Sequence, residues 1–202
     1  YKRQPQVAVG VDRFGTYAAG GIAFFFSDML GYHNLGLMTQ VAGRLVDSSA
    51  LVGYQNSKSR INWGAVAQRI PYVYGYYMAG YDERQQVYTE QELIYRQINY
   101  QLTGFASYPF SQVKRFELAA GYQLIDFQQE LRTYTYDPYG YLISYYKEKL
   151  PAPESLKFWI ASPALVYDSS FFGATSPILG QSYRFELAPL VGSLNFYTAL
   201  TD

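Results

Sequence analysis

The chain has 202 residues, with 16 basic and 16 acidic side chains and a formal net charge of zero. This length is enough for one domain with a hydrophobic core, and the balanced charge gives no basis for recruiting nucleic acid or an anionic surface. The absence of cysteine excludes disulfides, zinc–thiolate sites and cysteine nucleophiles.

Aromatic residues are abundant although the chain as a whole is not hydrophobic. Tyrosine occurs 23 times and phenylalanine 13 times, so 19% of the chain is aromatic, yet the mean hydropathy is only −0.15. A transmembrane β-barrel explains this combination, because half of each strand faces lipid and half faces water. No apolar run approaches the roughly 18 to 20 residues of a helical span, and the longest candidate covers only residues 21–26.

Alternating side chains and turn residues predict an all-β chain of about ten antiparallel strands in up-and-down order. The predicted strands cover residues 6–13, 17–27, 35–45, 50–56, 60–77, 92–108, 115–135, 141–168 (one strand or two, interrupted at 151–153), 182–188 and 193–201. The predicted turns cover residues 14–16, 28–34, 46–49, 57–59, 78–87, 109–113, 136–141, 169–180 and 189–192. Pro71 suggests that pairing loosens inside its strand or that its missing donor faces outward.

Apolar and polar side chains alternate most clearly along residues 92–108. The segment exceeds the usual strand length of about 5 to 6 residues, which favours a membrane-spanning wall with one apolar and one hydrated face. The residues predicted to face lipid, here and in residues 115–135, are Ile94, Ile98, Tyr100, Leu102, Phe116, Leu118 and Tyr122.

Polar and charged residues are predicted to line the lumen, because a charge in contact with lipid costs about 2 to 4 kcal/mol at the midplane. Cross-strand ion pairs inside the barrel are the favoured interpretation, and a polar conduit or docking surface is the alternative. The lumen-facing candidates are Asp12, Arg44, Arg96, Gln97, Asn99, Gln101, Glu117, Arg184 and Glu186.

The longest predicted strands flank residues 78–87 and 136–141, so this end is expected to project beyond the bilayer on the outside. A soluble lipocalin-like barrel also alternates, but its apolar side chains point inward. Small pairs such as Gly104 with Ala106, and tyrosines at strand ends, favour the membrane interpretation.

Nothing in the sequence indicates an enzyme, a cofactor or a metal. His33 is the only histidine and is interpreted as a turn residue. Glu90 and Glu92 could mimic a catalytic carboxylate pair, but their place beside a polar loop favours a solvated rim. No nucleophile-elbow, zinc-protease, P-loop or dinucleotide motif is present.

Three segments of the sequence carry a resemblance to a known family, namely residues 24–34, residues 164–168, and residues 172–186 together with 192–196. They resemble the bacterial surface antigen family, the outer-membrane barrels of the BamA and TamA superfamily, and in particular members with a periplasmic β-propeller. The resemblance implies a sixteen-stranded barrel in the outer membrane of Gram-negative bacteria. It also implies a role in protein insertion or translocation, with client outer-membrane or secreted proteins and a periplasmic domain in the same chain as partners.

The chain departs from this family in three respects. Only about ten strands are predicted, the Arg-Gly-Phe or Arg-Gly-Tyr signature is absent, and the last residues are Thr201 and Asp202 rather than an aromatic residue. Residues 1–202 are therefore interpreted as a single, partial barrel domain.

The first predicted strand carries the most specific functional prediction. In the resembled family this strand pairs weakly with the last one and forms a lateral gate, and unpaired backbone groups can template a client strand. The gate candidates are Val7, Val9, Gly10 and Val11. The alternative for this strand is an ordinary barrel strand near a domain junction. The alternatives for the function of the chain are a passive pore or structural outer-membrane barrel, and a soluble ligand-binding barrel.

Overall fold

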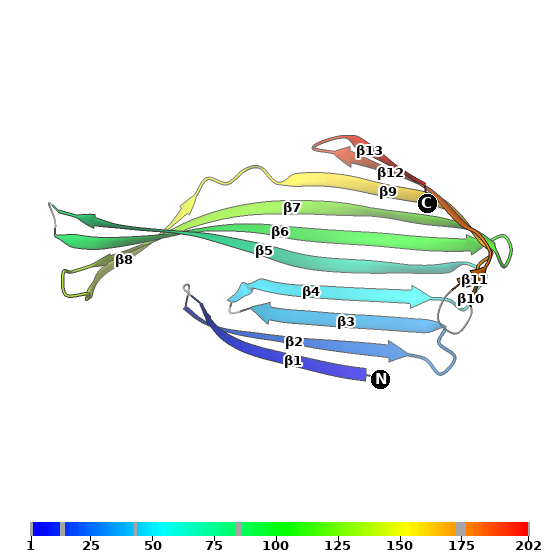
Figure 1. The fold of residues 1–202 in the computed structure, drawn as a ribbon, viewed down its shortest axis with the longest axis horizontal. Coiled ribbons are helices and arrows are strands. Elements are labelled where there is room, and N and C mark those ends of the chain that lie inside the picture. The colour runs from blue at the N-terminus through cyan, green and yellow to red at the C-terminus, as the bar shows by residue number, and fades with distance from the viewer. Residues whose placement is uncertain (1, 13–14, 43, 84–85, 173–176, 202) are drawn as a thin grey trace. The chain divides into compact units, whose positions relative to one another are not determined.

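The computed structural model describes residues 2–12, 15–42, 44–83, 86–172 and 177–201, and it describes side chains for residues 20–41, 46–83, 86–170 and 179–201. Its regular structure consists of β-strands (Figure 1). Within these residues, none belongs to a helix that is long and apolar enough to cross a membrane.

Thirteen strands follow one another along the described chain. They are β1 (Lys2–Asp12), β2 (Gly15–Ser27), β3 (His33–Ala42), β4 (Arg44–Asn56), β5 (Asn62–Asp82), β6 (Val87–Pro109), β7 (Lys114–Tyr136), β8 (Leu142–Leu150), β9 (Leu156–Asp168), β10 (Phe171–Phe172), β11 (Pro177–Leu179), β12 (Ser182–Gly192) and β13 (Phe196–Thr201).

Eleven of these strands form one antiparallel sheet in the order β1-β2-β3-β4-β5-β6-β7-β9-β12-β13, with β8 paired to β7 beside this path. Strands β10 and β11 pair only with each other. The predicted all-β, antiparallel, up-and-down fold is therefore confirmed. The sheet is not closed, because its path ends at β1 and β13.

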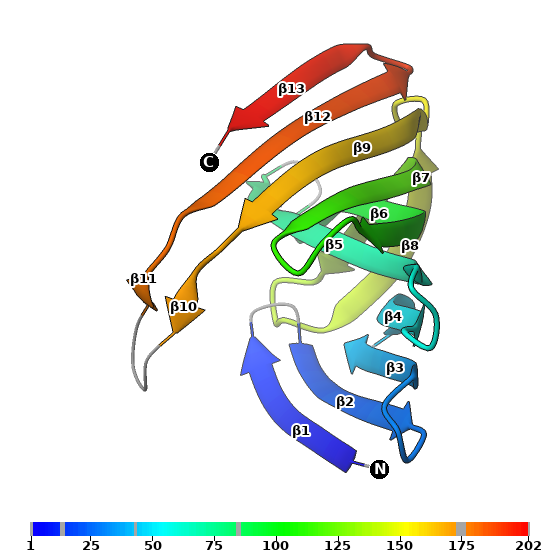
Figure 2. The same ribbon diagram turned by 90° about the vertical axis from the view of Figure 1, so that its right-hand side faces the viewer.

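The chain divides into two compact units, and β5, β6 and β7 contribute to both. The first unit comprises Tyr1–Ile70, Tyr100–Leu124 and Leu156–Asp202, and the second comprises Pro71–Asn99 and Ile125–Ser155. Figure 2 shows the strands of the first unit side by side in a curved sheet, with β1 and β13 at its two ends.

Two predicted turns are wrong. Residues 46–49 lie inside β4, where Ser49 pairs with Gln40, and residues 189–192 lie inside β12, where Pro189 pairs with Tyr197. Serine and proline are turn residues by local preference, and pairing with neighbouring strands overrides that preference here. Strand β5 likewise continues through Pro71.

The two faces of the first unit differ in chemistry and in exposure. Large apolar side chains occupy one face, which we call the exposed face; examples are Leu102 (58% exposed), Trp159 (67%) and Phe185 (59%). Polar side chains at the alternating positions are half-buried on the other face, which we call the covered face: Gln68, Gln101, Thr103, Glu117, Ser162 and Glu186. The unit therefore keeps its polar groups covered and leaves its apolar groups accessible.

A close approach on the covered face requires glycine at position 64. The Phe105 ring of β6 lies over Gly64 of β5, and a Cβ atom there would lie 2.5 Å from Phe105 Cζ and against the Tyr54 carbonyl oxygen. An alanine would displace the ring or separate β4 from β5.

We expect Gly64→Ala to lower the free energy of unfolding by about 1 to 3 kcal/mol, the usual cost of overpacking. Urea unfolding followed by tryptophan fluorescence is a suitable measurement, since Trp63 adjoins the site. Gly80→Ala is the matched control in the same strand, because nothing lies within 4 Å of a Cβ at Gly80. Equal midpoints for both variants would contradict the close approach.

Candidate functional site

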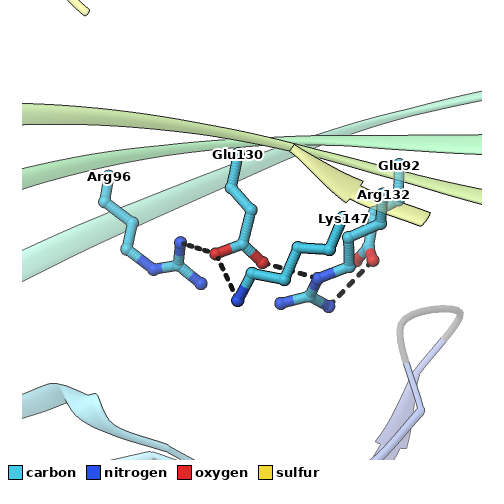
Figure 3. Close-up of polar contacts among 5 residues, drawn as sticks. All are labelled: Glu92, Arg96, Glu130, Arg132 and Lys147. Carbon is cyan, nitrogen blue, oxygen red and sulfur yellow. Dashed lines mark hydrogen bonds and ion pairs between the residues drawn. The ribbon is translucent and has the colours of Figure 1, made fainter. Parts of the chain in front are cut away.

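A cluster of five charged side chains lies in the second unit. Glu92 and Arg96 come from β6, Glu130 and Arg132 from β7, and Lys147 from β8 (Figure 3). Residues two or four apart in a strand point to the same face, which brings each pair on β6 and β7 together. Four of the side chains are nearly inaccessible, with exposures of 4% to 10%, and only Lys147 is partly open at 42%.

Glu130 is the centre of this cluster. Its Oε2 atom lies 3.2 Å from Arg96 Nη1 and 3.1 Å from Lys147 Nζ, and its Oε1 atom accepts a hydrogen bond of 2.7 Å from Arg132 Nε. Arg132 also donates from Nη1 to Glu92 Oε2 over 2.9 Å. The carboxylate of Glu130 thus joins cations from three consecutive strands.

The cluster keeps Glu130 ionised despite its burial. Burial by itself raises the pKa of this carboxyl, but hydrogen bonds from Arg132 and Lys147 and the charges of Arg132 and Arg96 outweigh it. The net result lowers the pKa of Glu130 to about 2. A buried carboxylate with this many donors acts as a structural crosslink, and it has no proton to exchange near neutral pH.

The structure corrects the predicted roles of four residues in this region. Ile94 and Ile98 are only 5% and 1% exposed, so protein covers them and the prediction that they face lipid is wrong. Arg96 lies on the same face of β6 as Ile94 and Ile98, and Gln97 lies on the opposite face. The prediction that Arg96 and Gln97 both face the lumen is therefore wrong. Glu92 is 8% exposed and belongs to the cluster, so its interpretation as a solvated rim residue is also wrong.

A second charged cluster lies on the covered face of the first unit. Arg184 of β12 contacts Glu117 of β7 and Glu186 of its own strand, each at 2.8 Å. Arg115 lies 2.6 Å from the other oxygen of Glu117, and the Ser162 hydroxyl of β9 donates to Glu186. The structure therefore brings together three of the predicted lumen residues, since Arg184 pairs with Glu117 across strands and with Glu186 within β12.

Amide side chains continue the covered face toward β5. Gln68 donates to Gln101 over 2.6 Å, and Gln101 donates to Thr103 over 3.1 Å. Gln97 and Asn99 are linked by a hydrogen bond of 3.1 Å in the second unit. Neighbouring polar side chains thus provide hydrogen-bond partners for one another.

The other residues predicted to face lipid occupy the exposed face to different degrees. Tyr100, Leu102 and Leu118 are 38%, 58% and 41% exposed. Phe116 and Tyr122 are half-buried, and the Tyr122 ring packs 5.0 Å from that of Trp159.

Several candidates lie outside the described side chains. These are the lumen candidates Asp12 and Arg44 and the gate candidates Val7, Val9 and Val11. The backbone of β1 is described, and it pairs with β2 from Lys2 to Asp12, with Val9 opposite Ala18 and Gly10 opposite Tyr17.

His33, which was predicted to lie in a turn, is the first residue of strand β3. Its backbone N–H donates to Asp28, and its Nδ1 atom lies 2.8 Å from the Tyr54 hydroxyl. Across the described residues, no group of three histidine or acidic side chains could hold a metal ion.

Sequence reasoning missed Glu130, Arg132, Lys147, Arg115 and Ser162 as members of the two clusters. A usable signal exists for the first two, because opposite charges at positions 130 and 132 must fall on one face of a strand. Their partners on β6 and β8 depend on strand register, which the sequence does not encode locally.

No family model, no curated protein and no solved structure matches this chain. The resemblance to the surface antigen family therefore stays a prediction from the sequence.

We expect Glu130→Gln to destabilise the second unit by about 3 to 5 kcal/mol, the usual cost of removing one partner from a buried ion pair. Amide hydrogen exchange across residues 92–98 and 129–135 would measure the change. Glu148→Gln is the matched control, because Glu148 of β8 is exposed and lies opposite Leu131. Equal protection in both variants would show that the cluster does not hold these strands.

Proposed function

We propose that this chain forms part of the wall of a transmembrane β-barrel in the outer membrane of a Gram-negative bacterium. The observation that carries the proposal is the distribution of side chains in the first unit. Its accessible face is apolar over β4, β5, β6, β7, β9 and β12, while its covered face holds ion pairs and amide contacts. Soluble monomers rarely expose contiguous apolar patches beyond a few hundred Å².

The same distribution argues against a soluble ligand-binding barrel. Such a barrel would turn Leu102, Trp159 and Phe185 inward to form its core, yet these are among the most exposed large side chains of the first unit. In a membrane, lipid would cover them and the Glu117–Arg184 cluster would line the lumen.

Aromatic pairs at strand ends support a membrane interface. Tyr54 and Trp63 lie 5.6 Å apart where β4 ends and β5 begins, and Tyr108 and Phe110 lie 5.3 Å apart at the end of β6. Tyr167 and Tyr183 lie 6.1 Å apart where β9 ends and β12 begins. Aromatic girdles at this level are typical of outer-membrane barrels.

Strand length agrees with one bilayer crossing. The part of β6 that belongs to the first unit, Tyr100–Pro109, has ten residues (109 − 100 + 1), and a tilted transmembrane strand needs about 9 to 11. The remaining part of β6, Val87–Asn99, belongs to the second unit. We assign the second unit to the region outside the membrane, by analogy with the long external hairpins of this class.

We also propose that the barrel inserts or translocates other proteins, with client outer-membrane or secreted proteins as partners. It is supported by the resemblance to the surface antigen family and by the position of β1 at the end of the sheet. An edge strand offers backbone N–H and C=O groups that can pair with an incoming strand. A passive pore or structural barrel is the competing function, and it needs no free edge.

Leu102→Lys should impair insertion far more than Gln101→Lys, although the two residues are adjacent. A lysine at position 102 would meet lipid, at a cost that rises from about 0 to 1 kcal/mol at the interface to about 2 to 4 kcal/mol at the midplane, whereas one at position 101 would meet the polar face. Refolding yield of the full chain into phospholipid vesicles, read by protease protection, measures the effect. Equal yields for the two variants would refute the assignment of the exposed face to lipid.

A photoreactive amino acid at Val9 tests the client-binding role. We expect crosslinks to other outer-membrane proteins from Val9 in the edge strand β1 and none from Val52. Val52 lies in β4 and pairs with Leu37 of β3 on one side and with Ala67 of β5 on the other. Crosslinked species are detected by mass spectrometry after irradiation of living cells. Crosslinks from neither position would favour the pore.

A further inference from the structure

One arginine interrupts the apolar exposed face of the first unit. Arg69 lies in β5 two residues after Ala67, so strand alternation puts it on the exposed face, and it pairs in register with Ala50 of β4. None of the ion pairs formed by described residues includes Arg69. Among the described residues, no carboxylate thus neutralises the charge of Arg69.

The guanidinium group of Arg69 is held in a fixed orientation. Its Nη1 atom donates to the Ser48 carbonyl and its Nη2 atom donates to the Val46 carbonyl over 2.7 Å. Its Nε atom contacts the Tyr100 hydroxyl at 3.5 Å, with the guanidinium carbon 5.7 Å from the Tyr100 ring centre. Arginine has five N–H donors, so two remain after these three contacts.

Arg69 borders a shallow apolar groove of about 510 Å³ on the exposed face. Small and branched side chains form this groove, among them Ala50, Val52, Ala67 and Leu102. A second groove of about 930 Å³ adjoins it, since both are lined by Leu102 and Tyr122, and its lining includes Gly104 and Ala161. The two grooves offer adjacent apolar channels beside one cation.

We propose that this surface binds a phosphorylated, multiply acylated glycolipid of the lipid A type. The grooves would take neighbouring acyl chains, and the two remaining N–H donors of Arg69 would meet a phosphate in the forked geometry that arginine provides. The inference rests on the proposed function, because only a membrane-embedded wall presents this face to lipid.

The position of Arg69 selects this occupant over an inner-leaflet phospholipid. Arg69 and Tyr100 lie where the first unit gives way to the second, next to Ile70 and Asn99, and the second unit is assigned to the outside. The phosphate would therefore lie at the outer leaflet, where lipid A carries phosphate groups above several acyl chains.

Native mass spectrometry of the full chain, refolded and delipidated in detergent, tests the proposal by titration with bisphosphorylated lipid A. Arg69→Gln should weaken binding about tenfold, which matches the loss of a charge-assisted contact. Arg60→Gln is the matched control, because Arg60 also stacks on a tyrosine, 4.7 Å from the Tyr108 ring centre, and binds a carbonyl, that of Pro109. It lies at the opposite strand end and should leave binding unchanged.

Variants of the groove floor cover the case in which Arg69→Gln fails to fold. Ala67→Phe fills the groove and should weaken binding by a similar factor, while Ala65→Phe, on the same face of β5 but outside the groove, should not. Undiminished binding by Ala67→Phe would overturn the proposal, as would equal binding of phosphatidylglycerol and lipid A by the unchanged chain. Insertion into vesicles is measured separately. A chain that inserts but binds lipid A without dependence on Arg69 refutes only the lipid site. A chain that never inserts refutes the proposed function as well.

Discussion

Alternation along a strand is the constraint on which the rest of this structure depends. Each strand of the first unit must place successive side chains on opposite faces, and antiparallel pairing aligns those faces across the sheet, as when Val52 pairs with Ala67 and Leu37. When the apolar side chains of one strand lie on the exposed face, the residues paired with them in the neighbouring strands lie on that face too. The ion pairs of Glu117 and Arg184 are possible because the same rule gathers charges from β7 and β12 on the covered face.

The same alternation of side chains gathers a buried ion-pair cluster in the second unit. Its strands need a crosslink that does not depend on a large apolar core, because only Ile94 and Ile98 supply buried apolar side chains among its described residues. The Glu130 cluster ties β6, β7 and β8 together through one carboxylate. Buried ion pairs add little net stability over apolar contacts, but a shift in strand register that separates the two partners is strongly destabilising. A one-residue slip of β7 would turn Glu130 to the opposite face.

The sequence was sufficient to predict the all-β fold, because alternation over residues 92–108 and 115–135 is strong and local. It was not sufficient to predict which apolar residues remain accessible. Ile98 and Leu102 lie on the same face of β6, yet one is 1% exposed and the other 58%. Both positions hold an apolar side chain, so alternation alone does not distinguish a position that protein covers from one that stays accessible. The turn expected at residues 46–49 failed for a related reason, since strand pairing outweighs the local preference of serine.

The two ends of the sheet connect the wall to its proposed role. Strands β1 and β13 each have one neighbour in the sheet, so each leaves a row of backbone groups that needs a partner. Within a bilayer there is no water to satisfy those groups, and every unpaired N–H or C=O would cost several kcal/mol. A wall built from these strands is therefore stable in lipid only when further strands complete it. The same requirement that closes such a barrel gives its seam an affinity for incoming strands, and a seam with weak pairing becomes a place where a client strand can compete. The physical basis of the proposed assembly function is thus such a seam, while the Glu130 cluster and the Glu117–Arg184 pair keep the strands that they join in register.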